Sequence, residues 1–235
     1  MKKLAIFVEG QTEQIFVRKL VVEVIGQNAV NIESIKVTGG KKVKEQWIRI
    51  NAFQLDPHKD YYVQIIDCGG DKNVVSKIRD NYDSLVTAGF SAIIGIRDVF
   101  PDFTFAEVPK LRNGLKYGMK TTPFEVTFAL GVMEIESWFL TEHTHFARLD
   151  PALTLDVIKA HCGFDPSIDD MQKQPHPAAD LNDIYQIAGL DYTKSKDEVK
   201  RTVDVLDYYR LYAEIPKKLP DLKLVVDVLD TFLAT

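Results

Sequence analysis

Residues 4–13 read LAIFVEGQTE, and this stretch decides the fold. Five apolar residues run into Glu9 and Gly10, after which the sequence becomes helical. Apolar side chains then recur at four-residue steps over residues 16–24, and Thr12 is placed to cap that helix. The stretch therefore predicts a buried first strand that delivers Glu9 to the carboxyl edge of a sheet, where open α/β sheets bind ligands.

Strand and helix patterns alternate over the next 120 residues. Strands are expected at residues 31–37, 61–66, 91–97 and 124–130, and helices at residues 43–53, 73–88 and 105–117. The nearly all-apolar strand at 91–97 is of the kind that helices bury on both faces. We therefore expect an α/β fold with a largely parallel sheet flanked by helices, in which a strand end passes into a helix near Glu136.

The chain changes character near Asp150, where the pattern becomes helical and acidic. Residues 1–149 carry a net charge of +1 and residues 150–235 carry a net charge of −6, which together give −5. We expect an α/β domain at residues 1–145 and a helical appendage, packed on it, at residues 146–235.

The composition is that of a cytoplasmic protein. No apolar run approaches the length of a membrane span, and no signal peptide follows Met1. Cys68 and Cys162 are too few and too far apart for a disulfide framework, and neither has the paired spacing of a zinc site. Both are expected to be ordinary thiols.

Two basic runs stand out in the first part of the chain. One contains Lys36, Lys41, Lys42, Lys44 and Arg49, and the other contains Lys110, Arg112, Lys116 and Lys120. Runs of this kind are more often a solvated face than a binding surface. If they flank an acidic site, they suit contacts with phosphate backbone.

Carboxylates occur at or beyond the ends of four predicted strands: Glu9 with Glu13, Asp67, Asp98 with Asp102, and Glu134 with Glu136. Acids that gather at one edge resist joint ionisation unless a cation compensates them. Magnesium prefers oxygen ligands, and the lack of clustered Cys and His argues against zinc. The acids therefore predict a divalent metal site, unless they simply cap helices or solvate strand ends, which is the better account of Asp67 and Asp102.

Three segments resemble the Toprim domain, the metal-binding module of primases, topoisomerases and the overcoming-lysogenization-defect family of nucleases. Residues 8–13 (VEGQTE) match its first motif and are similar to the start of small bacterial Toprim-like proteins. Residues 94–98 (IGIRD) resemble the strand that leads to its aspartate motif, and residues 134–140 (EIESWFL) its third acidic segment. The resemblance covers residues 1–145 and departs at Phe100, where the family has a second aspartate.

The resemblance implies a nuclease, or a related phosphodiester-processing enzyme, that uses Mg²⁺ or Mn²⁺. It implies metal ligands at Glu9, Asp98, Asp102, Glu134 and Glu136, and catalytic roles for Glu9, Glu13 and Asp98. Nucleic acid, DNA or RNA, would be held by its backbone through Lys41, Lys42 and Lys44 or through Lys110, Arg112 and Lys116. Such an enzyme could belong to a defence or repair system.

The alternative is a Toprim-like scaffold with degraded catalysis. Phe100 and the mild net charge favour this interpretation. Such a scaffold would bind a nucleic acid or a protein, the latter through its helical tail.

Overall fold

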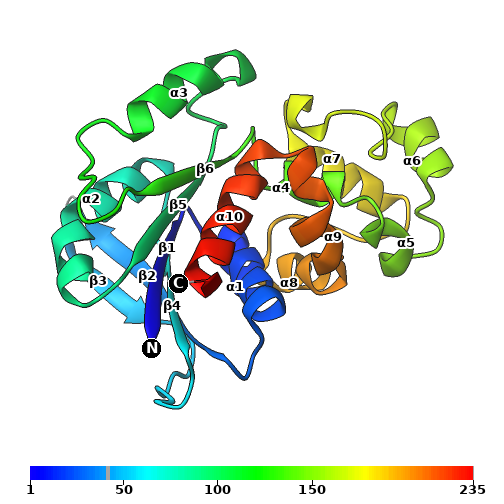
Figure 1. Ribbon diagram of the computed structural model, residues 1–235. Helices are drawn as coiled ribbons and strands as arrows, with labels where there is room; N and C mark the ends of the chain where they lie inside the picture. The colour runs from blue at the N-terminus through cyan, green and yellow to red at the C-terminus, as the bar shows by residue number, and fades with distance from the viewer. Residues whose placement is uncertain (41–42, 235) are drawn as a thin grey trace. The chain divides into compact units, whose positions relative to one another are not determined.

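The computed structural model describes residues 1–40 and 43–234 (Figure 1). The strands are β1 (Lys2–Val8), β2 (Val30–Gly40), β3 (Val43–Arg49), β4 (Tyr61–Asp67), β5 (Ala92–Asp98) and β6 (Thr127–Gly131). The helices are α1 (Gln11–Ile25), α2 (Asp71–Thr87), α3 (Val108–Leu115), α4 (Glu136–Thr141), α5 (His145–Leu149), α6 (Leu155–Cys162), α7 (Pro177–Gln186), α8 (Lys196–Val205), α9 (Tyr208–Ala213) and α10 (Pro220–Ala234).

The sheet has the order β3-β2-β4-β1-β5-β6. Strand β1 runs parallel to β4 and β5, and β2 runs parallel to β4, whereas β3 is antiparallel to β2. The predicted fold class, a mostly parallel α/β sheet flanked by helices, is therefore confirmed. Among the described residues, no helix combines the length and the apolar character needed to cross a bilayer.

The chain forms two compact units. The first comprises Met1–Arg97, Arg112–Ala129 and Lys223–Thr235, and the second comprises Asp98–Leu111 and Leu130–Leu222. This division differs from a boundary at residue 145, because residues 98–111 belong with the helices and the last helix returns to the sheet. The chain passes between the two units four times, after residues 97, 111, 129 and 222, and no composition change in the sequence marks these points.

Helices cover both faces of the sheet in the first unit (Figure 1). On one face, Gln14 of α1 donates from Nε2 to the carbonyls of Ile35 (2.8 Å) and Ile65 (3.0 Å). On the other face, the side chain of Ile78 in α2 lies so close to Gly95 that a Cβ there would be 2.8 Å from it. Close packing on both faces explains why β5 reads as an unbroken apolar run.

The sequence predicted Thr12 as the N-cap of helix α1, but Thr12 lies inside the helix. The helix begins at Gln11, and Glu13 Oε2 accepts the backbone N–H of Gly10 at 2.9 Å. The expected cap was wrong because Gly10, in extended conformation, supplies the N-cap position and Glu13 at the third helical position closes back on it.

Residues 43–53 do not form the expected helix. Residues 43–49 are strand β3, which pairs with β2, and Trp47 and Ile50 are exposed rather than inward-facing. Gly39 lies at a register shift in this pairing, and its φ of +85° and a distance of 2.6 Å from a Cβ to Lys44 O admit only glycine. Tertiary pairing thus overrode the apparent helical spacing.

Candidate functional site

The second unit holds a site formed by the end of β5 and the turn that follows β6. The backbone N–H of Val99 donates to Gly131 O, and that of Phe100 donates to Met133 O at 2.8 Å. A Cβ on Gly131 would lie 2.3 Å from Asp98 Oδ1 and 2.7 Å from Ile135 N. Only glycine therefore lets the buried Asp98 carboxylate sit against this turn.

Glu134 and Glu136 lie on the same turn and share one lysine. Lys194 Nζ is 2.9 Å from Glu134 Oε1 and 3.1 Å from Glu136 Oε2. The other oxygen of each acid is held by a neutral donor, since Ala178 N–H donates to Glu134 Oε2 (3.0 Å) and Tyr192 OH donates to Glu136 Oε1 (2.9 Å). We call Asp98, Glu134, Glu136 and Lys194 the acidic cluster.

The electrostatics of the acidic cluster follow from burial. Burial raises the pKa of Glu136, which has no exposed surface, and the nearby Lys194 partly offsets this rise while Glu134 adds to it. Burial alone would lower the pKa of Lys194, but the carboxylates of Glu136, Glu134 and Asp98 outweigh it and raise that pKa. The lysine is therefore a firmly charged counterion.

The backbone at Lys194 is itself unusual. Its φ is +63°, in the left-handed region that a residue with a Cβ adopts at a cost of about 1 kcal/mol. Glycine or asparagine would suit this backbone better. The presence of lysine there indicates that the side chain, rather than the turn, accounts for the residue at this position.

Two further residues of the second unit lie beside the acidic cluster. Burial raises the pKa of Asp180 to about 6, and the charges of Asp183 and Glu134 add to the rise. Phe100 makes an edge contact with the ring of His176 at 5.1 Å between centroids. Phe100 therefore has a packing role at this position.

Glu9 and Glu13 belong to the first unit. The backbone at Glu9 is fixed, because Gly70 N–H donates to Glu9 O and Cys68 N–H to Val8 O, both at 2.9 Å. The Glu9 side chain is partly exposed, whereas that of Glu13 is buried as the cap of α1. Asp67, at the end of β4, accepts Gly69 N–H at 2.9 Å and lies 3.9 Å from Lys36 Nζ.

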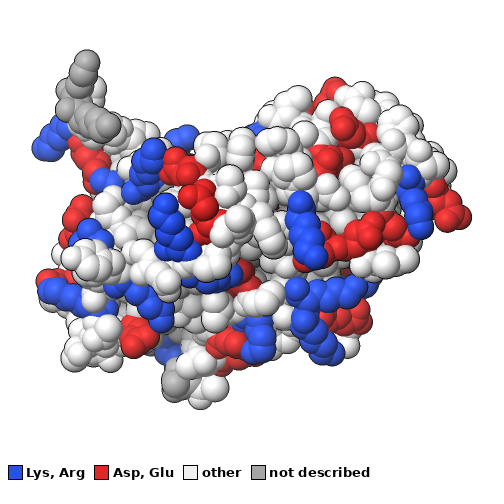
Figure 2. Space-filling view, turned by 90° about the horizontal axis from the view of Figure 1, so that it is seen from above, with Lys and Arg blue, Asp and Glu red and all other residues white. Residues whose placement is uncertain are grey.

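The expected basic residues are only partly available for substrate. Lys41 and Lys42 lie outside the described residues, and Lys44 is exposed on β3. Lys110 pairs with Glu107 at 3.5 Å and Lys116 with Glu125 at 3.7 Å, while Arg112 lies on α3. Figure 2 likewise shows basic and acidic side chains mixed over one face of the molecule.

The predicted metal ligands are gathered only in part. Within residues 1–40 and 43–234, no three His, Cys, Asp or Glu side chains are grouped so that they could hold a metal ion. Glu134 and Glu136 instead face the ammonium group of Lys194, and Asp102 is a half-buried residue of the turn that follows β5. The metal site stays a prediction.

Of the two histidines that follow Glu136, His143 is half-buried in a turn, and His145 lies in the interior. His145 is fully buried, and its Nε2 lies 3.1 Å from the hydroxyl of Tyr185, which donates to Thr202 Oγ1 at 3.0 Å. Glu142 is also fully buried and binds Arg148 Nη2 at 3.1 Å. The buried members of this network, Glu142, His145, Tyr185 and Thr202, connect the helices of the second unit, and the network reaches solvent through the exposed Arg148.

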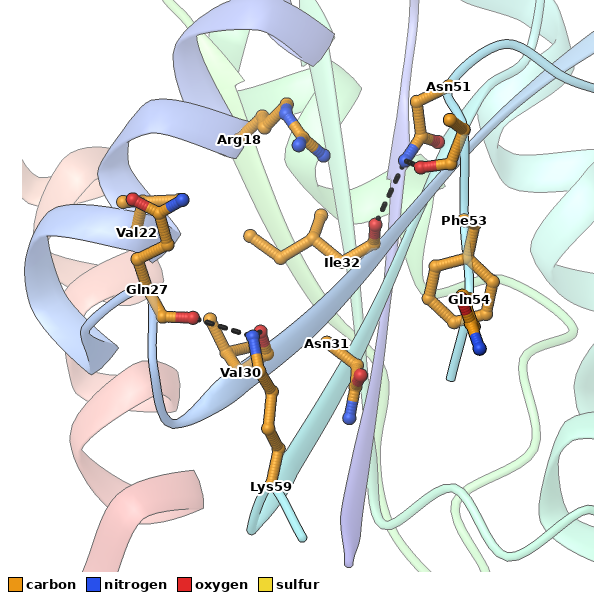
Figure 3. Close-up of a pocket in the computed structure, with 11 residues that line it drawn as sticks. Arg18, Val22, Gln27, Val30, Asn31, Ile32, Asn51, Phe53, Gln54 and Lys59 are labelled. Carbon is orange, nitrogen blue, oxygen red and sulfur yellow. Dashed lines mark hydrogen bonds between the residues drawn. The ribbon is translucent and has the colours of Figure 1, made fainter. Parts of the chain in front are cut away.

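A separate pocket of about 290 Å³ lies in the first unit beside α1 (Figure 3). Lys59 Nζ donates to Gln27 O (2.7 Å) and Val30 O (3.0 Å), and Asn51 Nδ2 donates to Ile32 O (3.2 Å). The described residues that line it include no acid, cysteine or histidine. Its polar side chains hold the segment after β3 against β2 and are not placed for catalysis.

The sequence did not identify Lys194, Tyr192 or Gly131 as site residues. Lys194 and Tyr192 lie 60 and 56 positions beyond their partners, in a segment between α7 and α8 with no motif. Gly131 did carry a usable signal, because a glycine between a predicted strand and two acids indicates a close approach.

Comparison with family models, curated proteins and solved structures finds no match for this chain.

Proposed function

We propose that this protein hydrolyses phosphodiester bonds of nucleic acid with the help of Mg²⁺ or Mn²⁺. The supporting observation is that Glu134 and Glu136 bind one ammonium group and that the charge of Asp98 also acts on it. Carboxylates stay ionised this close together only around a cation. The position of Lys194 Nζ is therefore one at which this protein stabilises positive charge.

Carboxylate oxygens are the donors that a hard divalent ion prefers. Within the described residues these carboxylates are not grouped to hold an ion, so metal binding requires that Lys194 leave and that the acids close on the ion. Asp98, Glu134 and Glu136 would hold the ion, and Glu9 and Asp102 remain predicted further ligands. When bound, such an ion supplies Lewis acidity towards phosphate and favours hydroxide near neutral pH.

The side chains of this protein have roles of their own in that reaction. Ala178 N–H and Tyr192 OH orient one oxygen of each glutamate, which leaves the other oxygen to meet a cation. Lys194 competes with a divalent ion for these oxygens. Glu9 is the preferred candidate base, because its side chain is partly exposed, whereas the carboxylate of Glu13 binds Gly10.

The substrate is proposed to be DNA or RNA held by its backbone, and the cytoplasm is the proposed location. In the first basic run, Lys44 is exposed on β3, and the exposed Lys36 and Arg49 already pair with Asp67 and Glu33. A contact of this kind attracts phosphate without reading sequence. Lys110, Arg112 and Lys116 remain candidates for the same role.

Calorimetric titration with MnCl₂ tests the metal site. The wild type is expected to bind Mn²⁺, and Asp98→Asn and Glu134→Gln are each expected to weaken binding at least about tenfold, which is about 1.4 kcal/mol. Glu125→Gln is the matched control, because Glu125 is an exposed acid that pairs with the exposed Lys116 on the surface. Failure of the wild type to bind Mn²⁺ contradicts the proposal.

A nuclease assay tests the reaction. Labelled single-stranded DNA, duplex DNA and RNA are incubated with Mn²⁺ and either the wild type, Glu9→Gln or Glu134→Gln. We expect the wild type to cleave at least one substrate and Glu134→Gln to lose that activity. Equal products from all three proteins would identify a contaminant and reject the proposal.

A second candidate, a non-catalytic scaffold, is favoured by the ion pairs of Lys194. These pairs already satisfy the glutamates without a metal. In that case the wild type binds no Mn²⁺ and Lys194→Met loses stability without gaining metal affinity.

A further inference from the structure

Strand β3 is the free edge of the sheet in the first unit (Figure 1). Ile50 N–H donates to Ser34 O at 2.9 Å, and the same register places Lys36 opposite Ile48 and Val37 opposite Trp47. In an antiparallel pair, alternate residues direct their N–H and C=O groups towards the partner. Residues 46, 48 and 50 therefore face β2, and Glu45, Trp47 and Arg49 direct their backbone groups outward.

This edge is more apolar than a solvent-facing strand requires. The exposed fractions are 66% for Val43, 38% for Trp47, 44% for Ile48 and 52% for Ile50. Edge strands that stay unpaired are usually short, charged or interrupted by proline. The seven-residue strand β3 exposes Val43, Trp47 and Ile48, and Ile50 directly follows it. These apolar side chains stand beside the charged Lys44, Glu45 and Arg49 and offer a surface for a strand with complementary charges.

The charges on β3 fit a second copy of the same strand. If two β3 strands pair antiparallel about a two-fold axis at Trp47, Glu45 of each copy faces Arg49 of the other, and the two Trp47 rings meet. An axis at residue 45 or 49 would place Glu45 or Arg49 against its own copy, which is unfavourable. An axis at Gln46 would give no ion pair. The register with its two-fold axis at Trp47 is therefore self-complementary in both charge and backbone hydrogen bonds.

Contacts within one copy already order these side chains. Arg49 binds Glu33 and lies over the ring of Phe53 at 5.3 Å. Glu45 binds Lys77 and accepts the Trp47 indole N–H at 2.8 Å. Little side-chain entropy remains to be lost when a second strand docks.

We infer that β3 is a self-association edge through which two copies of this chain form one continuous sheet, with Glu45 of each copy paired to Arg49 of the other. A single strand pair buries less than the roughly 1,200 Å² of a stable interface, so the dimer is weak and depends on concentration. The inference is independent of the proposed nuclease function.

Charge exchange between two variants tests it in the full chain. Sedimentation velocity over a concentration series is expected to show a monomer–dimer equilibrium for the wild type, and at least about tenfold weaker dimerisation for Glu45→Arg and for Arg49→Glu. An equimolar mixture of the two variants is expected to restore the dimer, because arginines in one chain then face glutamates in the other. Lys44→Glu is the matched control, since in this register Lys44 faces the uncharged Ile50.

A further variant covers the case in which Arg49→Glu fails to fold because Glu33 loses its partner. Trp47→Pro removes an N–H that points away from β2, so it spares β2 pairing and abolishes the dimer. Circular dichroism and urea unfolding confirm the fold of each variant. A wild type that stays monomeric, a mixture that does not recover, or a Trp47→Pro variant that still dimerises or loses only nucleic-acid binding would overturn the inference.

Discussion

Two groups of acids at strand ends in this protein are neutralised in different ways. In the first unit, Glu13 accepts Gly10 N–H and Asp67 accepts Gly69 N–H, both at 2.9 Å. In the second unit, Glu134 and Glu136 bind the ammonium group of Lys194. A backbone amide is fixed in place, so it makes a carboxylate part of a turn, whereas a lysine side chain can rotate away and be replaced by another cation. The second group is therefore the better candidate site.

The largest effect is expected from Gly131→Ala, which removes the close approach on which the acidic cluster depends. A Cβ placed 2.3 Å from Asp98 Oδ1 and 2.7 Å from Ile135 N forces the turn apart, at a cost of about 3 kcal/mol. Urea unfolding measures the loss. Gly114→Ala is the control, because nothing lies within 4 Å of a Cβ at that helical position, and it should be neutral or slightly stabilising.

Lys194→Met tests whether the acidic cluster needs its lysine. The variant leaves Glu136 buried without a counterion, and we expect a loss of about 2 kcal/mol near neutral pH. The raised pKa of Lys194 means that, while its acid partners are ionised, its contribution is lost on the alkaline side only as the pH rises above its ordinary range. The stability difference between the wild type and Lys194→Met should shrink in acid, where Glu136 takes up a proton. A deficit that persists unchanged in acid would contradict this account, and Lys194→Met/Glu136→Gln should recover most of the stability.

Glu13→Ala tests an acid of the first unit, whose carboxylate caps a helix by accepting a backbone N–H. Loss of the bond to Gly10 N–H is expected to cost about 1 kcal/mol and to leave Mn²⁺ affinity unchanged. Glu23→Ala, which breaks only the surface pair with Lys19, should cost less than about 0.5 kcal/mol. If Glu13→Ala abolished metal binding, Glu13 would belong to the site.

Asp180→Asn tests the electrostatics of the second unit through the pH dependence of stability. The pKa of Asp180 rises from its ordinary 3.8 to about 6 in the folded protein, so ionisation opposes folding as pH climbs through this interval. Asparagine does not ionise, and the variant should therefore gain melting temperature relative to the wild type as the pH rises. Asp204→Asn, at an exposed position, should show a flat difference. Parallel curves for both variants would contradict the raised pKa.

Local patterns predicted most of the sheet. The strands expected at residues 61–66 and 91–97 are present as β4 and β5, and the helix expected near Glu136 begins there. These elements could be predicted because each consists of an apolar run a few residues long, which is visible in the sequence itself. Strand β3 was missed because its pairing depends on the register shift at Gly39 and on the neighbouring strand β2, which its own pattern does not specify.

The amino-acid sequence by itself determined the α/β class, the placement of acids after strands, and the presence of a glycine before Glu134. Only the tertiary structure decided which of those acids face a cation and which face a backbone amide. The physical reason is range: strand and helix patterns repeat every two to four residues. The lysine that neutralises Glu134 lies 60 residues further along the chain, in a left-handed backbone position that no periodicity marks.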